Sequence, residues 1–152
     1  MVSVARASGT GFNPTAGWAF LATPATVTVA TGQIVHVTST KVLGSAVTGG
    51  GTSLDLDICR QSLVGGSTIA TSGMGGLYGV RVPQNTRQPM AVSMMFSGLP
   101  AGTYQVGLCA KSDNPASWNY NEYSYTTAIV FAAAGAGAAK TDDITPRAEP
   151  RD

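Results

Sequence analysis

Short runs of alternating apolar and polar residues, separated by glycine and proline, extend along most of the chain. Nowhere in the sequence do apolar residues recur at helical spacing over three turns, whereas alternation with a period of two is typical of half-buried strands. Strands are predicted at 16–22, 25–30, 33–39, 54–61, 77–82, 90–97, 103–110 and 125–131. The pattern therefore predicts an all-β fold, a two-sheet antiparallel sandwich that is jelly-roll-like and has about eight strands.

The same alternation assigns side chains to faces. Leu54, Leu56 and Ile58 alternate with polar residues, so they are predicted to face the core. A further set is predicted to point inward: Tyr78, Val80, Val82, Val92, Met94, Phe96, Tyr104, Val106 and Leu108. Four glycines between residues 44 and 53 predict a loop there.

The chain divides by composition into three parts. Residues 1–14 are predicted to form an N-terminal arm and residues 15–131 the β-sandwich domain. From residue 132 to 152 the sequence becomes rich in alanine and glycine and then in charged residues, which predicts a flexible tail.

Charged residues are scarce, at 11% of the chain, against about 25% in an average soluble domain. The surface must therefore take its polarity from Thr, Ser, Asn, Gln and Gly, a composition common on extracellular and virion proteins. The formal net charge is +1, and the lysines and arginines of the sandwich are scattered singly. A nucleic-acid partner is therefore not expected.

Two further features bear on location. No stretch approaches the roughly 20 apolar residues of a membrane span, and the N-terminal sequence MVSVARASGT lacks the apolar core of a signal peptide. We expect no membrane insertion and an extracellular or virion-associated protein. Release could follow lysis, transport within a phage particle, an unconventional route or a signal outside this sequence.

The segment 95–110, MFSGLPAGTYQVGLCA, reads as a strand, a Pro-Ala-Gly turn and a tyrosine-containing strand. It resembles the complement and tumour-necrosis-factor jelly-roll superfamily at three positions, Phe96, Gly102 and Tyr104. The order of motifs over about 15–131 also resembles small bacterial and phage-associated domains. The resemblance implies a homotrimer or an assembly module that recognises a surface. The chain has too few residues between Tyr104 and Phe131 for the extra strand pair usual in the superfamily, which argues against a complete jelly roll.

The two cysteines, Cys59 and Cys109, each share a strand face with polar residues, so both thiols are predicted to point away from the core. The resembled jelly roll would make their strands neighbours, and the thiols could then form a cross-strand disulfide. The alternative is two unpaired cysteines on a face that another subunit covers. The sequence leaves both possibilities open.

Catalytic and metal-binding motifs are not evident. Before the tail the only carboxylates are Asp55, Asp57, Asp113 and Glu122, and no nucleophile-elbow, phosphate-loop or dinucleotide motif occurs. Asp55 and Asp57 share one strand face, which favours a solvated or interfacial face over a calcium site. With one histidine, His36, and no Cys/His cluster, no metal and no cofactor are expected. We predict a non-enzyme; a hydrolase using Asp113 and Glu122 is a lesser alternative.

The segment 112–125, SDNPASWNYNEYSY, concentrates aromatic rings and hydrogen-bonding side chains. The candidate ligand-binding residues are Asp113, Asn114, Trp118, Asn119, Tyr120, Asn121, Glu122 and Tyr123. Aromatic faces beside amide groups suit a sugar ring or a protein surface. In the structural alternative Trp118 covers one end of the sandwich, the tyrosines pack over it and the asparagines shape turns.

These features predict a non-catalytic structural and binding module that assembles with itself and recognises or decorates a surface of the virion, fibre or cell-surface type. The expected partners are further copies of the chain, as a homotrimer on the resemblance, and a glycan or surface protein in adhesion. The alternative is a monomeric glycan-binding domain that uses the loop from Trp118 to Tyr125.

Overall fold

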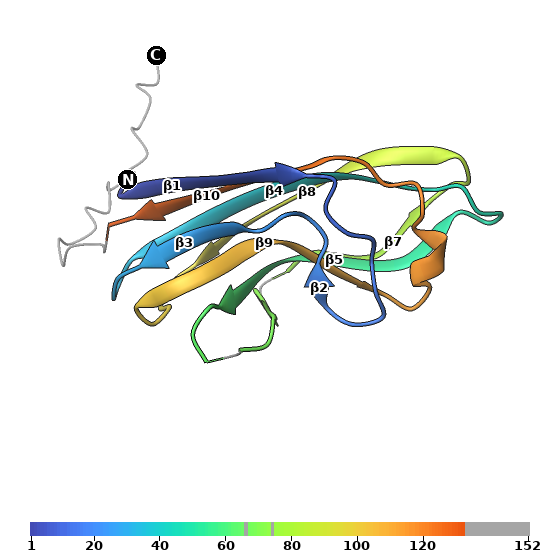
Figure 1. Cartoon of the computed structure of the whole chain (residues 1–152). Helices are drawn as coiled ribbons and strands as arrows, with labels where there is room; N and C mark the ends of the chain where they lie inside the picture. Colours follow the sequence, from blue (N-terminus) through green and yellow to red (C-terminus); the bar gives the residue numbers. More distant parts are fainter. Residues whose placement is uncertain (66, 74, 133–152) are drawn as a thin grey trace, which may run out of the picture.

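The computed structural model describes residues 1–65, 67–73 and 75–132 and contains two antiparallel β-sheets that face each other (Figure 1). Sheet A, the upper layer in Figure 1, has the strand order β1-β10-β4-β8. These strands are β1 (Ser3–Gly9), β10 (Ser124–Phe131), β4 (Ile34–Ser45) and β8 (Thr86–Phe96). The prediction of an all-β antiparallel sandwich is confirmed.

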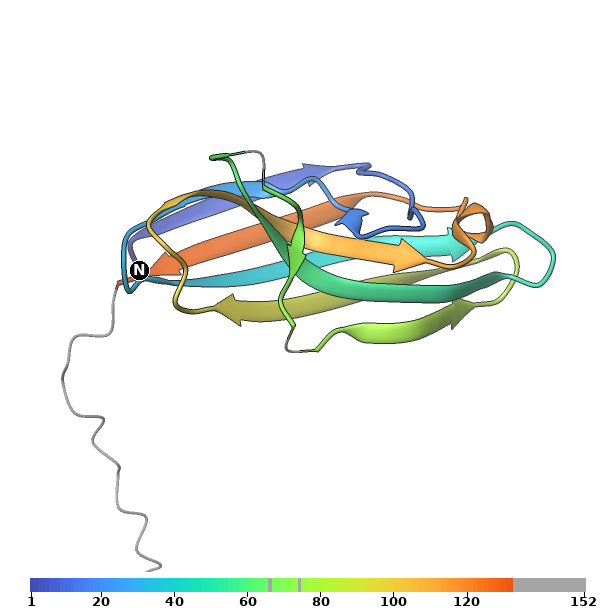
Figure 2. The ribbon, with the colours of Figure 1, turned by 90° about the horizontal axis from the view of Figure 1, so that it is seen from below.

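Sheet B lies in front when the molecule is viewed from below (Figure 2). Its central strands are β9 (Gly102–Ser112) and β5 (Gly51–Ser62). Outside them, β2 (Ala19–Phe20) and β3 (Ala25–Val29) pair with β9, while β6 (Ala70–Thr71) and β7 (Leu77–Val82) pair with β5.

The strand order is that of a jelly roll, because the first strand lies beside the last and the intervening strands divide between two sheets. β2 and β3 share one position in sheet B and β6 and β7 share another, so each sheet has four strand positions. The argument against a complete jelly roll was wrong, since no extra strand pair between Tyr104 and Phe131 is needed to fill them.

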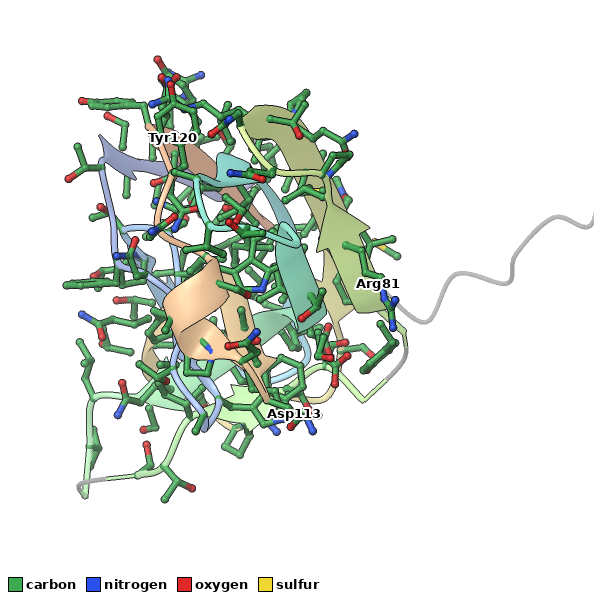
Figure 3. All side chains as sticks on the ribbon, turned by 90° about the vertical axis from the view of Figure 1, so that its right-hand side faces the viewer. Arg81, Asp113 and Tyr120 are labelled. Atoms are coloured by element: carbon green, nitrogen blue, oxygen red, sulfur yellow. A yellow bond between two sulfur atoms is a disulfide. The ribbon has the colours of Figure 1, made fainter. Side chains whose placement is uncertain are left out.

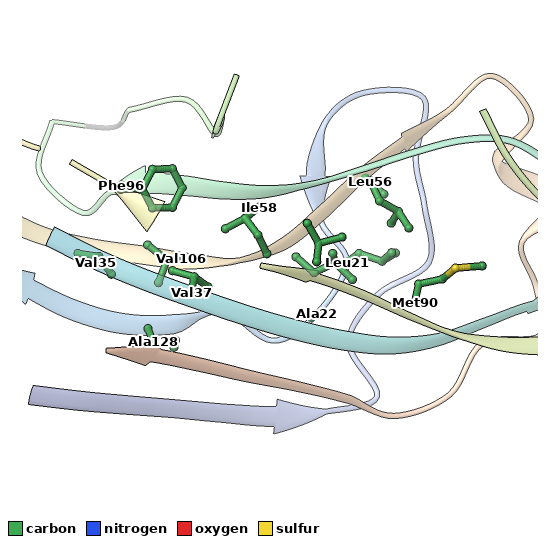
Figure 4. Close-up of a cluster of buried hydrophobic side chains, with 14 of the residues drawn as sticks. Leu21, Ala22, Val35, Val37, Leu56, Ile58, Met90, Phe96, Val106 and Ala128 are labelled. Atoms are coloured by element: carbon green, nitrogen blue, oxygen red, sulfur yellow. The ribbon is translucent and has the colours of Figure 1, made fainter. Parts of the chain in front are cut away.

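Apolar side chains from both sheets fill the space between them (Figure 4). Leu54, Leu56 and Ile58 are fully buried there, as the alternation predicts. Of the other residues predicted to point inward, Val82, Val92, Phe96, Tyr104, Val106 and Leu108 are also buried. Each large apolar side chain removed from water contributes about 1.5–3 kcal/mol, so this interface holds the two sheets together.

The predicted N-terminal arm is instead part of the sandwich. Residues 3–9 form β1, which pairs with β10 from Ser3–Val130 to Gly9–Ser124. Ala5 and Ala7 pack against the core, and their small side chains give little hydrophobic contrast along the sequence. Because of this weak contrast, the alternation pattern did not reveal the strand.

The predicted loop at 44–53 is shorter than expected, because β4 continues through Ser45 and β5 begins at Gly51. Glycine is needed here for close packing. A Cβ on Gly44 would lie 2.4 Å from the Thr86 carbonyl oxygen, and one on Gly51 would lie 3.0 Å from the Trp118 ring. The glycines therefore mark crowded strand ends.

Tyr78 was predicted to point inward but is 58% exposed. Gly79, with φ +66°, interrupts the regular alternation of β7, and the pairing of β7 with β5 shifts register twice. Beyond Ala132 the predicted tail lies outside the described residues. In the described part of the chain, no helix has the length and apolar character needed to cross a membrane.

Candidate recognition surface

The loop from residue 113 to 123 joins β9 to β10 and closes one end of the sandwich (Figure 3). It begins with a short 3₁₀ turn, η1 (Pro115–Ser117), whose first residue is the proline that fixes the backbone. Trp118 follows and is fully buried, with its Nε1–H donating to the Thr52 carbonyl oxygen at 2.9 Å. Trp118 is therefore not available to a ligand, contrary to the prediction, and it covers the end of the core.

Two of the predicted asparagines hold this loop in place. The Asn119 Oδ1 accepts a hydrogen bond from the Ala46 N–H at 2.9 Å. The Asn121 Oδ1 accepts one from the Gly44 N–H at 3.0 Å, and its Nδ2 donates to the Trp118 carbonyl oxygen at 2.7 Å. Since these amides satisfy backbone groups at the end of β4, in the residue after it and in the loop itself, their observed contacts are structural.

The tyrosines of the segment remain exposed. Tyr120, Tyr123 and Tyr125 all present much of their surface to solvent, and the Tyr123 and Tyr125 rings have centroids 5.3 Å apart with an interplanar angle of 55°. The Arg87 guanidinium lies over the Tyr120 ring, 3.4 Å from its centroid, and pairs with the Glu122 carboxylate. The loop thus offers an aromatic surface on the side of sheet A.

The carboxylates considered for hydrolysis do not come together. The Glu122 carboxylate pairs with Arg87, whose guanidinium lies over the Tyr120 ring. Asp113 lies at the other end of this loop region from Tyr120 (Figure 3). Asp113 and Asn114 are both exposed. Among the described residues, no group of three or more His, Cys, Asp or Glu side chains could hold a metal ion.

Of the two possibilities left open for the cysteines, the structure contains the disulfide: Cys59 and Cys109 are bonded, with their Cα atoms 5.6 Å apart. The bond joins β5 to β9 on the face of sheet B away from the core. Both residues are fully buried there under Trp18, Phe20 and Ile69. Segments of this same chain therefore cover the disulfide.

Asp57 is also buried beside this cluster by residues of its own chain, which corrects the prediction of a solvated or interfacial face. Its Oδ1 accepts hydrogen bonds from the Ser72 hydroxyl at 2.6 Å and from the Ile58 N–H at 2.7 Å. Asp55, by contrast, is partly exposed and lies 3.6 Å from the Lys111 ammonium. Ser72, which directly follows the short strand β6, contacts the carboxylate that the alternation placed at the surface.

The outer face of sheet A is exposed and has few charges. At one end of this face, a row of paired residues runs across the sheet from Val4 through Ile129 and His36 to Met95. We call this the apolar end and define it by Val2, Val4, Ile34, Met95, Ile129 and Phe131. Met95 is 62% exposed. The four strands of sheet A contain no Asp or Glu.

A hollow of about 560 Å³ lies within the apolar end, between β4 and β8. Ile34, Met94 and Met95 line it together with His36, whose Nε2 shares a hydrogen bond of 2.8 Å with the Ser93 hydroxyl. The hollow is mainly apolar, with this polar pair and Ser97 at its wall. Such a surface suits the side chains of another protein.

Sequence reasoning missed several residues of this face. Arg87 and Glu122 are far apart in the sequence, and only the pairing of β4 with both β8 and β10 brings them together. The alternation of Ile34, His36 and Thr38, opposite the buried valines of β4, was the available signal for the outer face. Composition alone could not show that the outward residues of four strands form one continuous surface.

No protein-family model matches the sequence, and no curated protein matches it. Among solved structures, it is similar to a chain in the structure of infectious bursal disease virus, Gt strain, with a TM-score of 0.46, 11% identity and coverage of 84% of this chain and 31% of that one. The Gx strain of the same virus gives a TM-score of 0.46, 10% identity and coverage of 84% and 32%.

A third similar structure is Eiger TNF from S. frugiperda, with a TM-score of 0.39, 11% identity and coverage of 96% of this chain and 92% of that one. The chain spans about a third of the length of the virus chains it matches. At these values, the likeness is too distant to assign a function.

Proposed function

We propose that the protein is a non-catalytic module that assembles with itself through the apolar end of sheet A and serves as a building or decorating unit of a virion, fibre or cell surface. The observation that carries this proposal is the exposure of Val4, Met95 and Phe131 on one sheet face with no carboxylate among them. Grouped exposed apolar residues mark protein interfaces, whereas singly scattered ones do not.

The size of the face supports the same conclusion. Four strands about 4.8 Å apart, each with about eight residues at 3.3 Å, give sheet A an outer face of roughly 500 Å² in projection. A standard interface buries about 800 Å² on each partner, counted over the uneven accessible surface. The apolar end would form the core of such an interface, and the serine and threonine side chains beside it on β4 and β8 would form part of its polar rim.

Light scattering on the native protein tests the assembly. The mass is expected to be a multiple of the 15.4 kDa chain. It should equal that of three chains if the resemblance to the jelly-roll superfamily extends to the oligomer. Met95→Glu places a carboxylate within the apolar end, where burying an unpaired charge is costly, and should dissociate the oligomer at micromolar concentration.

Val64→Glu is the matched control, because Val64 is an exposed apolar residue in the turn after β5 of sheet B. It should leave the mass unchanged. A monomeric wild-type protein, or a Met95→Glu variant with the mass of the wild type, would overturn the proposal. Melting temperatures of the variants exclude unfolding as the cause of dissociation.

A second candidate function is glycan binding, which the exposure of Tyr120, Tyr123 and Tyr125 favours. Exposed aromatic rings combine an apolar face with a polar tip, and both can contact a sugar. These tyrosines lie toward the opposite end of sheet A from Phe131. Assembly at the apolar end would therefore leave this surface open, so the two functions are compatible. Asp113 and Asn114, which are exposed where the same loop leaves β9, remain candidates.

A further inference from the structure

A groove of about 230 Å³ runs between β1 and β10 on the outer face of sheet A. Arg6, Ser8, Tyr125 and Thr127 line it, together with the backbone between them. In the strand register Arg6 lies opposite Thr127 and Ser8 opposite Tyr125. Four outward side chains on two adjacent strands thus form the corners of a small square, because directly paired residues are about 5 Å apart and the next row about 7 Å away.

Arg6 gives the groove a positive charge. Within the described residues the ion pairs are Arg87–Glu122 and Lys111–Asp55, so Arg6 belongs to neither. No strand of sheet A contributes a carboxylate. An exposed guanidinium has a planar set of donors that fits a carboxylate through two parallel hydrogen bonds. The groove therefore favours an anionic ligand.

The rest of the groove suits a sugar ring. Tyr125 is 63% exposed and is braced by Tyr123, so its ring forms a wall beside the groove. An aromatic wall packs against the C–H face of a sugar, and the Ser8 and Thr127 hydroxyls can each donate or accept a hydrogen bond with sugar hydroxyls. The volume has room for one ring, since it equals that of roughly eight water molecules.

We infer that this groove binds a sugar residue that carries a carboxylate, of the uronic or sialic acid class, with the carboxylate on Arg6 and the ring against Tyr125. This inference rests on glycan binding, the second candidate function. It adds to that function the charge of the ligand, the position of the site on β1 and β10, and a recognition residue, Arg6, outside the aromatic segment.

Titration of the native protein with oligosaccharides that carry uronic or sialic acid, each compared with an analogue whose carboxylate is reduced to the alcohol, tests the inference by calorimetry or NMR. The carboxylated form should bind at least about tenfold more tightly, since a charge-assisted hydrogen-bond pair is lost on reduction. Arg6→Gln should remove this preference, and Tyr125→Thr should weaken the binding of both the carboxylated and the reduced oligosaccharide.

Arg81→Gln is the control, because Arg81 is an exposed arginine on β7, in the other sheet (Figure 3). It should bind like the wild type. Equal binding of acid and reduced analogue, or an unchanged preference in Arg6→Gln, would refute the carboxylate site while leaving glycan binding intact. If no oligosaccharide of either kind binds the wild type, glycan binding itself fails.

Discussion

Lys41 places an ammonium group inside the sandwich, at the residue scale the least expected feature of the fold. It is fully buried, and its Nζ donates hydrogen bonds to the Thr10 carbonyl oxygen and, at 3.0 Å, to the Glu122 carbonyl oxygen. Lys41 lies two residues beyond the predicted strand end, and the alternation of β4 continues through it, so its side chain points inward. The sequence would not predict its burial, because lysine is almost never fully buried.

Desolvation by burial lowers the pKa of Lys41 from its ordinary 10.5. Between the lowered pKa of the folded state and 10.5, the unfolded chain binds more protons than the folded one, so this residue makes the free energy of unfolding rise with pH in that window. Urea unfolding of the wild type and of Lys41→Met at several pH values up to 11 should show this rise only in the wild type. Parallel profiles for the two proteins would contradict the assignment.

Trp118 and Tyr123, five residues apart, have opposite roles. Trp118→Ala should lower the free energy of unfolding by about 3–5 kcal/mol, because it leaves a cavity in the core and removes the hydrogen bond from the indole to the Thr52 carbonyl oxygen. Tyr123→Ala should cost less than about 1 kcal/mol, since nearly half of that side chain is exposed. Denaturant unfolding measures both. A large loss for Tyr123→Ala would mean that the tyrosines are structural.

At the scale of elements, sequence predicted strands best where large apolar residues alternate with charged ones. β5, in which Leu54, Leu56 and Ile58 alternate with two aspartates, is the clearest case. β1 was missed because alanine fills its inward positions, and the outward face of β7 was misassigned at Tyr78 because Gly79 changes the backbone direction. The candidate site was predicted only in part, because burial of Trp118 and the proximity of Arg6 to Tyr125 depend on strand pairing.

The disulfide is the covalent link between elements, joining β5 to β9 across 50 residues of sequence. Closing a loop of that length in the unfolded chain stabilises the fold by about 2–4 kcal/mol. The double variant Cys59→Ala, Cys109→Ala should unfold at correspondingly lower urea concentration. Because the bond is within one chain, the native mass should be the same with and without the bond. A change of oligomer mass in the double variant would contradict a purely intrachain role.

At the scale of the whole molecule, the two sheets differ in how far their outer faces are covered. Sheet B carries the disulfide on its outer side, where Trp18, Phe20 and Ile69 of the same chain cover the bond. Sheet A leaves its outer face open, with apolar residues at one end and tyrosines at the other. Strand count and turn spacing were sufficient to predict the sandwich, but not which sheet would remain uncovered, since that depends on how loops fold back over a face.

The pairing of β1 with β10 gives the molecule a base and a tip. Ser3 lies beside Val130, so the start of β1 and the end of β10 lie at the same pole, while η1 and the tyrosine loop occupy the opposite pole (Figure 1). A domain with neighbouring ends can be carried as an insert within a larger protein. Held at the base by both ends, such an insert would point its tip, with the tyrosine loop, away from the protein that carries it.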